Sequence, residues 1–161
     1  MPIYLKFEGE PIPGEAGAKG YEKQIECESV QMGASNQLDR TSAGWSGGTV
    51  SISEITLSKM LDEASTKLFQ ACCAGKMHTK ALISVVKQAT DTKTANSPYL
   101  TYALEGVYVV GYSASSGGDR PSESFSLAFK KITIKYMTAD DKGALTAKAP
   151  EVSWDLMKNL G

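Results

Sequence analysis

The opening residues alternate between apolar and polar side chains with a period of two. Ile3, Leu5 and Phe7 form the apolar face, and they alternate with Tyr4, Lys6 and Glu8. This spacing predicts a half-buried β-strand. The same pattern recurs along most of the chain and predicts about eight to ten strands in all. The further strands that it predicts span residues 25–32, 50–57, 80–87, 99–104, 107–113, 125–136 and 152–156.

The segment Glu105–Tyr136 has the composition of a long β-hairpin. Two runs rich in Val, Ile, Tyr and Phe flank the sequence SASSGGDRPSES. β-Branched and aromatic residues favour strands, whereas Gly, Ser, Asp and Pro favour turns. The apolar face of this hairpin shifts by one residue at Lys130–Lys131, and a similar shift occurs at Ser53–Glu54. A β-bulge at each position accounts for the shift and predicts a sharply curved sheet, as in a barrel or a sandwich.

One segment, Ser65–Ala74, has the pattern of a short α-helix. Asp62 or Ser65 can cap its start, and Gly75 suits its end. The expected fold is therefore mainly β: a single β-barrel, or two packed antiparallel sheets, with one short helix over about residues 65–74.

Four polar or glycine-rich segments are predicted as loops. They span residues 10–20, 33–49, 88–98 and 138–150. The second of them is longer than most loops in compact domains, and loops of such length are usually functional or disordered. It carries Trp45 near its middle, and a large aromatic residue on a loop suggests that the loop docks on a partner.

Composition and charge restrict the possible classes of protein. The chain has 161 residues, which fits one domain over 1–161, and its formal net charge is -1. This balance gives no long-range attraction to nucleic acid or to an anionic membrane. No segment approaches the roughly 20 apolar residues of a membrane helix. Lys6, Glu8 and Glu10 interrupt the N-terminal region where a signal peptide would be apolar, so we expect folding in the cytosol and any export by another route.

Residues with the chemistry of catalysis are scarce. His78 is the only histidine, and the three cysteines match no disulfide or zinc pattern. The pairs Asp62–Glu63 and Asp140–Asp141 suit capping or solvated positions. The glycine pairs at 47–48 and 117–118 fit turns, because neither follows a phosphate-loop pattern. We therefore expect no enzyme, no metal and no cofactor, and what remains is either a self-assembling structural protein or a barrel that binds a small ligand.

The order of motifs along the chain resembles the Hcp family, whose members form the inner tube of bacterial type VI secretion systems. The resemblance begins with YLKFEG and continues through SGGTVSISEITLSK and DEASTKLFQACCAGKMHTKALISV. It includes GVYVVGYSASSGGDRPSESFSLAFKKITIKY and ends with VSWDLMKN. It thus extends over nearly the whole chain.

The resemblance implies a β-barrel that assembles into homohexameric rings, which stack into a tube and are expelled by a contractile sheath. It implies the spike, the sheath and effector proteins as partners, with effectors held inside the ring. It also implies assembly in the cytoplasm and secretion without a cleaved signal peptide. Some members of the family carry a toxin domain after the barrel, and we expect none here because this chain ends at Gly161, directly after the last predicted strand. A phage-type tail-tube protein shares this fold and is the nearest alternative, followed by a ligand-binding or adaptor barrel.

With this resemblance, the long loop and the hairpin turn become candidate contacts between subunits or rings. We expect residues 33–49 to pack on the adjacent subunit or on the next ring, and the turn SASSGGDRPSES to lie at the rim. The candidate interface residues are Gly33, Trp45, Gly47, Gly48, Gly117, Gly118, Asp119 and Arg120.

Overall fold

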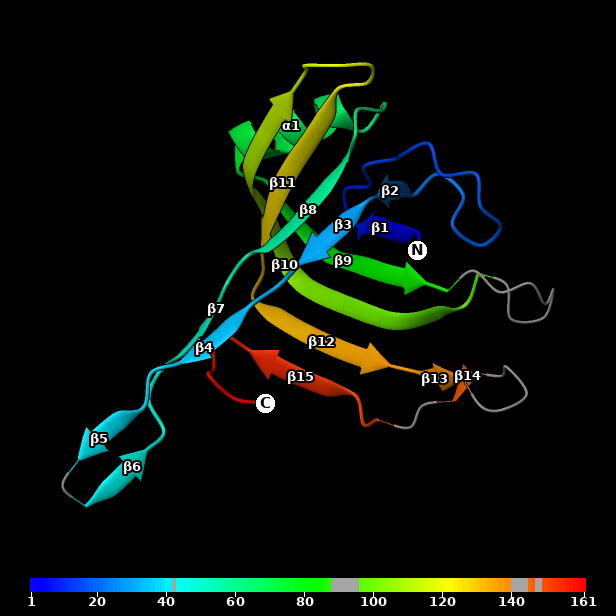
Figure 1. Cartoon of the computed structure of the whole chain (residues 1–161). Coiled ribbons are helices and arrows are strands. Elements are labelled where there is room, and N and C mark those ends of the chain that lie inside the picture. Colours follow the sequence, from blue (N-terminus) through cyan, green and yellow to red (C-terminus); the bar gives the residue numbers. More distant parts are fainter. Residues whose placement is uncertain (42, 88–95, 140–144, 147–148) are drawn as a thin grey trace.

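The computed structural model describes residues 1–41, 43–87, 96–139, 145–146 and 149–161 (Figure 1). In these ranges the chain is mainly β, with one helix, α1 (Ser65–Ala74). The strands are β1 (Ile3–Glu8), β2 (Ile25–Cys27), β3 (Ser29–Gln31), β4 (Ala34–Asn36), β5 (Asp39–Thr41), β6 (Gly44–Ser46), β7 (Val50–Ile52), β8 (Ile55–Met60), β9 (Met77–Val86), β10 (Pro98–Ser115), β11 (Ser122–Ala128), β12 (Lys131–Tyr136), β13 (Thr138–Ala139), β14 (Leu145–Thr146) and β15 (Val152–Asp155). The expected fold class is confirmed.

The main sheet closes on itself. Its strands follow the antiparallel order β2-β1-β9-β10-β11-β8-β3. The two end strands, β2 and β3, are consecutive pieces of one segment that are separated only by Glu28, whose N–H donates to the carbonyl of Ser58 at 2.8 Å. Residues 25–31 therefore join both edges of the sheet, and closure of this kind leaves few unpaired strand edges.

The strand β10 belongs to both halves of the barrel (Figure 1). Its first half pairs with β9 and β12, and its second half pairs with β11. The direction changes near Gly106, which has a φ of 62°. On the other side of this bend, β11 ends at Ala128 and β12 starts at Lys131, where the sequence shows its phase shift. The second shift also coincides with a break, because β7 ends at Ile52 and β8 starts at Ile55, so the structure has separate strands at both positions where β-bulges were predicted.

Apolar side chains fill the interior of the barrel. Alternate residues of β1, β8, β9, β10 and β11 point inward and form one cluster with Leu68 of α1. The fully buried apolar side chains include Leu5, Ile25, Ile55, Leu57, Leu68, Ile83, Leu104 and Leu127. At about 1.5–3 kcal/mol for each large side chain removed from water, this core is the main source of stability.

A row of alternating charges crosses the strands β1, β9, β10, β12 and β15 of the main sheet. The register of β1, β9, β10, β12 and β15 aligns five charged residues side by side: Glu8, Lys80, Glu105, Lys131 and Asp155. Within this row the Lys131 ammonium lies 3.7 Å from the Glu105 carboxylate. Exposed pairs of this kind contribute little free energy of unfolding.

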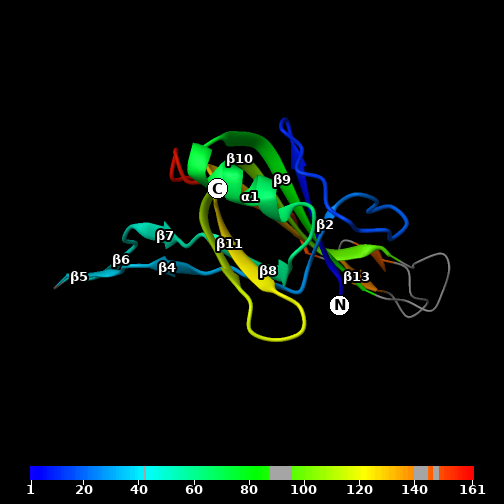
Figure 2. The same cartoon turned by 90° about the horizontal axis from the view of Figure 1, so that it is seen from above.

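Local contacts fix both ends of α1, which covers β10 on one side of the barrel (Figure 2). The carboxylate of Asp62 accepts the N–H of Ala64 at 2.9 Å just before the helix. Gly75 ends it in the left-handed conformation, and its N–H donates to the carbonyl of Ala71 at 3.1 Å. The N-cap position is Ala64 and has no side-chain cap, so neither predicted residue caps the helix: Asp62 holds the turn before it, and Ser65 is buried.

The four predicted loops had different outcomes. Residues 10–20 are irregular as predicted, but Ile12 and Ala16 are buried against the barrel. The prediction for 33–49 was wrong, because this segment contains β4, β5 and β6 in antiparallel pairs. The segment 138–150 includes the short pair of β13 and β14, and most of 88–98 lies outside the described residues. In the described ranges, α1 is too short and too polar to cross a membrane.

Candidate interaction surfaces

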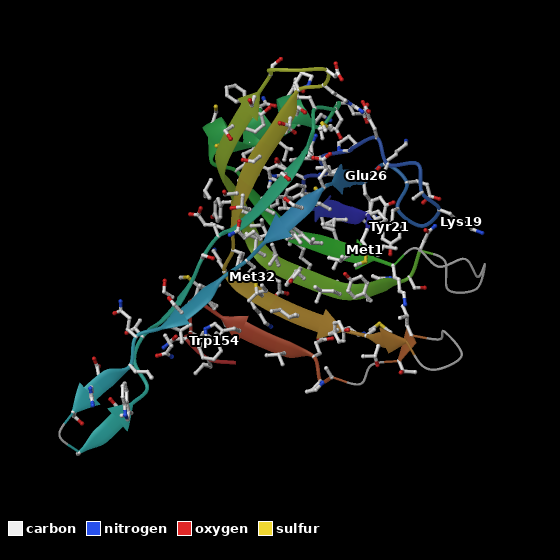
Figure 3. The ribbon with its side chains drawn as sticks, viewed as in Figure 1. Met1, Lys19, Tyr21, Glu26, Met32 and Trp154 are labelled. Carbon is white, nitrogen blue, oxygen red and sulfur yellow. The ribbon has the colours of Figure 1, made fainter. Side chains whose placement is uncertain are left out.

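A two-stranded arm projects from the barrel (Figures 1 and 2). It continues the β3–β8 pair outward through β4 paired with β7 and ends in the β5–β6 hairpin. Every described residue from 34 to 47 is exposed. Met32, at the base of the arm, is half-buried against the core (Figure 3). The arm therefore leaves the barrel after Met32, and Ile52 of β7, at its base, is half-buried against the hydrophobic core.

The tip of the arm presents a cation and an aromatic ring together. Arg40 and Trp45 face each other across β5 and β6, and the guanidinium carbon lies 5.2 Å from the centre of the indole ring. Trp45 is 67% exposed, and Leu38 nearby is 54% exposed. Tryptophan and arginine are the residue types most enriched at the centres of protein interfaces. Their pairing at an exposed tip is typical of a surface that a partner covers.

The glycines of the arm have different roles. Gly33 pairs with Ser53 at the base: its N–H donates to the Ser53 hydroxyl at 2.9 Å, and its carbonyl accepts the Ser53 N–H at 2.8 Å. A Cβ on Gly48 would lie only 1.2 Å from the carbonyl oxygen of Gln37, so a side chain cannot fit there. A Cβ on Gly47 would meet no atom within 4 Å. Gly33 and Gly48 thus shape the arm, whereas Gly47 does not need to be glycine for steric reasons.

The turn that carries the other four candidates lies elsewhere. Gly117, Gly118, Asp119 and Arg120 join β10 to β11 and are exposed. Gly117 and Gly118 have open space around them, and Arg120 donates from Nη2 to the carbonyl of Leu61 at 3.4 Å. Figure 1 shows this turn at the top of the barrel and the arm at its lower left. The structure therefore divides the eight candidates into two separate surfaces.

A surface cavity of about 370 Å³ lies beside this turn, at the end of the barrel where β2 and β8 end. Its lining residues are Glu15, Ala16, Glu26, Cys27, Glu28, Met60, Asp62 and Arg120. Four carboxylates thus surround the cavity against one guanidinium. The sequence analysis did not predict this acidic cavity, because its residues come from four segments that only the fold brings together.

A buried ionic cluster lies next to this cavity. The Lys59 ammonium is fully buried, 2.7 Å from the Glu123 carboxylate and 2.6 Å from that of Asp62. Ser65 donates to Glu123 at 3.0 Å, and the Tyr112 hydroxyl donates to Glu123 at 2.6 Å. The cluster links β8, β11, β10 and the start of α1.

The sequence contained a signal for this cluster. Lys59 follows Ile55 and Leu57 at the inward positions of β8, and Glu123 precedes Phe125 and Leu127 at the inward positions of β11. The alternation alone places both charges inside. The expectation that Asp62 serves a capping or solvated role is wrong: its side chain is only 9% exposed, it pairs with Lys59, and no side chain caps the helix.

Two ionisable groups near the cluster are held in their neutral forms. Burial, followed by the hydrogen bond to Glu123, raises the pKa of Tyr112 to about 12. Burial raises the pKa of the Cys27 thiol to about 12 as well, and the nearby Lys59 charge only partly opposes this. Cys27 is therefore a neutral thiol at physiological pH, without the ionised form that a nucleophile or a metal ligand needs.

The remaining chemically active residues are dispersed. His78 is buried against Phe7, with ring centres 4.6 Å apart, and its Nδ1 contacts the carbonyl oxygen of Glu10 at 2.8 Å. Within the described ranges, no three His, Cys, Asp or Glu side chains are grouped as a metal site would require. The arm and the acidic cavity are therefore the two surfaces on which a functional assignment depends.

Comparison with known proteins shows the family to which a chain with these surfaces belongs. Residues 4–136 match the family model described as "Type VI secretion system effector, Hcp". The chain belongs to the Hcp family. The resemblance noted in the sequence is thus confirmed, and the Hcp family consists of non-enzymatic proteins that are secreted through the type VI system.

Individual relatives agree with this assignment. Protein hcp1 of Pseudomonas aeruginosa is 25% identical over 113 residues, which cover 69% of this chain and 68% of the relative. A solved structure described as a type six secretion system protein has a TM-score of 0.87 at 27% identity and covers 98% of this chain and 97% of its own. Hcp1 of Salmonella typhimurium shares the fold, with a TM-score of 0.75 at 23% identity over 99% of this chain and 97% of that one.

Proposed function

We propose that this Hcp-family protein is the tube subunit of a type VI secretion system. In this proposal residues 1–161 fold as one barrel domain, six copies form a ring, rings stack into the inner tube, and effectors bind in the lumen. The partners are further copies of the chain and the spike, sheath and effector proteins. Assembly takes place in the cytoplasm, and the tube leaves the cell without a cleaved signal peptide.

The exposed arm is the observation that carries this proposal. An arm with Trp45 and Leu38 more than half exposed leaves apolar surface in water, and burying it on a neighbour recovers free energy. The arm and the rest of the barrel surface are different, so a contact between them joins unlike surfaces. Such heterologous contacts produce closed rings or open stacks, according to the rotation between copies.

A barrel that carries a small ligand is the less favoured function. The interior of this barrel is filled by fully buried side chains such as Leu57, Leu104 and Leu127, as in a packed core. A phage-type tail tube is the other alternative, and it would use the same fold and the same arm. The neighbouring genes distinguish a phage tail tube from a secretion tube: sheath and spike genes indicate secretion, and capsid genes indicate a phage.

The test compares the assembly of the full chain with that of a variant that lacks residues 35–46. Native mass spectrometry and negative-stain microscopy should show hexameric rings for the full chain. For the deletion variant they should show folded barrels with rings or stacks lost. Lys67→Ala, on the exposed face of α1 and outside the candidate surfaces, is the control and should assemble normally. A full chain that stays monomeric, or a deletion variant that assembles and is secreted normally, would contradict the proposal.

A further inference from the structure

The arm and the acidic cavity have complementary chemistry on one chain. We infer that the cavity lined by Glu26, Glu28 and Asp62 is the receptor for the Arg40–Trp45 tip of another copy's arm. This inference rests on the proposed tube function and deepens it, because it names the residues on both sides of one contact between copies.

The cavity has an excess of negative charge and lacks a matching cation. Glu15, Glu26 and Glu28 are exposed at its rim, whereas the fourth carboxylate, Asp62, is already paired with the Lys59 ammonium at 2.6 Å. The one cation in the lining, Arg120, already donates to the carbonyl of Leu61. The exposed side chain of Met60 and the buried Ala16 add apolar surface to the same cavity. Carboxylates beside apolar atoms suit a guanidinium stacked on an aromatic ring.

The arm supplies such a group. Arg40 lies within 4.0 Å of no carboxylate in the described part of the chain, and its guanidinium is instead stacked on Trp45. The stacking holds the cation in one position before any partner binds, which reduces the entropy lost on docking. The volume of about 370 Å³ is within the usual range of binding cavities, which is roughly 300–1,000 Å³.

The two surfaces cannot meet within one molecule. Figure 3 labels Glu26 at the edge of the cavity and Met32 where the arm begins, and from Met32 the arm runs away from Glu26. The view from above also separates the arm from the end of the barrel near β2 (Figure 2). A contact between surfaces at opposite ends of the molecule joins copies head to tail, and repetition of that contact extends a stack.

Exchange of the charges tests the inference. Arg40→Glu should weaken the association between rings by roughly 30-fold, since it replaces one partner of a charged interface pair with a like charge. Glu26→Arg/Glu28→Arg should weaken it similarly, and the three substitutions together should restore at least a tenth of the wild-type association. Sedimentation velocity across protein concentrations gives the ratio of single rings to stacks for each variant. Higher ionic strength should weaken the wild-type contact.

Lys67→Glu is the matched control, because it makes the same change of charge on the exposed face of α1. It should stack like the wild type. A second measurement locates the contact: in a Cys72→Ser/Cys73→Ser background, Arg40→Cys should form an intermolecular disulfide with Glu28→Cys and not with Lys67→Cys.

The outcomes separate this inference from the proposed function. If rings form and stack but Arg40→Glu changes nothing, or if Arg40→Cys cross-links to position 67 instead of 28, the receptor is elsewhere and the tube function stands. If the wild-type chain forms no rings, both fail. Loss of stacking in each single-surface variant, with recovery in the charge exchange, supports the inference.

Discussion

Lys59 is a cation with no access to water, and its position makes the stability of the barrel depend on one side chain. Its ammonium is neutralised by Glu123 and Asp62 at 2.7 and 2.6 Å. Lys59→Met removes the cation and leaves two buried carboxylates without a counter-charge. We expect the free energy of unfolding to fall by about 3–5 kcal/mol, measured by urea denaturation.

The exposed Lys67→Met in α1 is the control for this substitution and should change stability by no more than about 0.5 kcal/mol. Lys59→Met/Glu123→Gln should be less destabilised than the sum of the two single variants, because it removes charge from both sides of the pair. A wild-type unfolding midpoint for Lys59→Met would show that the cluster does not stabilise the fold.

Tyr112 makes the stability depend on pH in the alkaline range. Its pKa is raised from 10.0 to about 12 in the folded state, so the folded chain holds this proton more tightly than the unfolded chain. The resulting stabilisation is complete below pH 10 and is lost as the pH rises toward 12, because the unfolded state then releases the proton first. Urea midpoints measured across this range should fall less steeply for Tyr112→Phe than for the wild type. Equal slopes would contradict the assignment.

At the scale of elements, Gly106 determines the bend of the longest strand. Its φ of 62° is unfavourable for other residues, and a Cβ there would lie 2.7 Å from Cδ of Lys130. Gly106→Ala should therefore lower the free energy of unfolding by about 1–3 kcal/mol. Gly111→Ala, in the same strand with a nearest contact of 3.4 Å, should be tolerated better. Thermal unfolding of the two variants makes the comparison, and equal losses would mean that the bend does not depend on glycine.

The elements differ in how well the sequence predicts them. Residues 65–74 follow their periodicity, because one face of the helix meets the core. The first strand departs from its pattern at Tyr4, which is buried with Tyr21 and Val86 in a second cluster. The strands in 33–49 were not predicted because β4, β5 and β6 are exposed and pair only with β7 or with one another. With no buried face, they show no alternation of apolar and polar residues. Gly106 has no sequence pattern that distinguishes it from a turn glycine.

At the scale of the whole molecule, the sequence could identify candidate contact residues but could not predict where they lie relative to one another. Trp45 could be selected from the sequence because a large aromatic in a polar segment is unusual, and Arg120 was selected with its turn. Their separation onto two surfaces, and the addition of Glu26, Glu28 and Asp62 beside Arg120, depend on strand order. Strand order arises from pairings between distant segments, which no local pattern records.

At the scale of the whole molecule, the residues that form the hydrophobic core and the exposed residues of the arm lie in different parts of the chain. Every described residue from 34 to 47 is exposed, so this part of the arm buries little apolar surface in its own chain. Deleting residues 35–46 should leave the free energy of unfolding of the monomer within about 0.5 kcal/mol of the full chain. A shorter connection between β3 and β8 also loses slightly less entropy on closure, which favours the folded state. Urea denaturation at a concentration where both proteins are monomeric measures the difference.

A substitution in the other long segment provides the contrast for this deletion. Ile12 is only 6% exposed within 10–20, and Ile12→Ala should cost about 2–5 kcal/mol by leaving a cavity. If the arm deletion destabilised the monomer as much as Ile12→Ala does, the arm would be part of the folding unit. If it costs nothing while rings or stacks are lost, the only contribution of the arm is to contacts between copies. Of the two long polar segments at the start of the chain, one then stabilises the barrel and the other serves assembly.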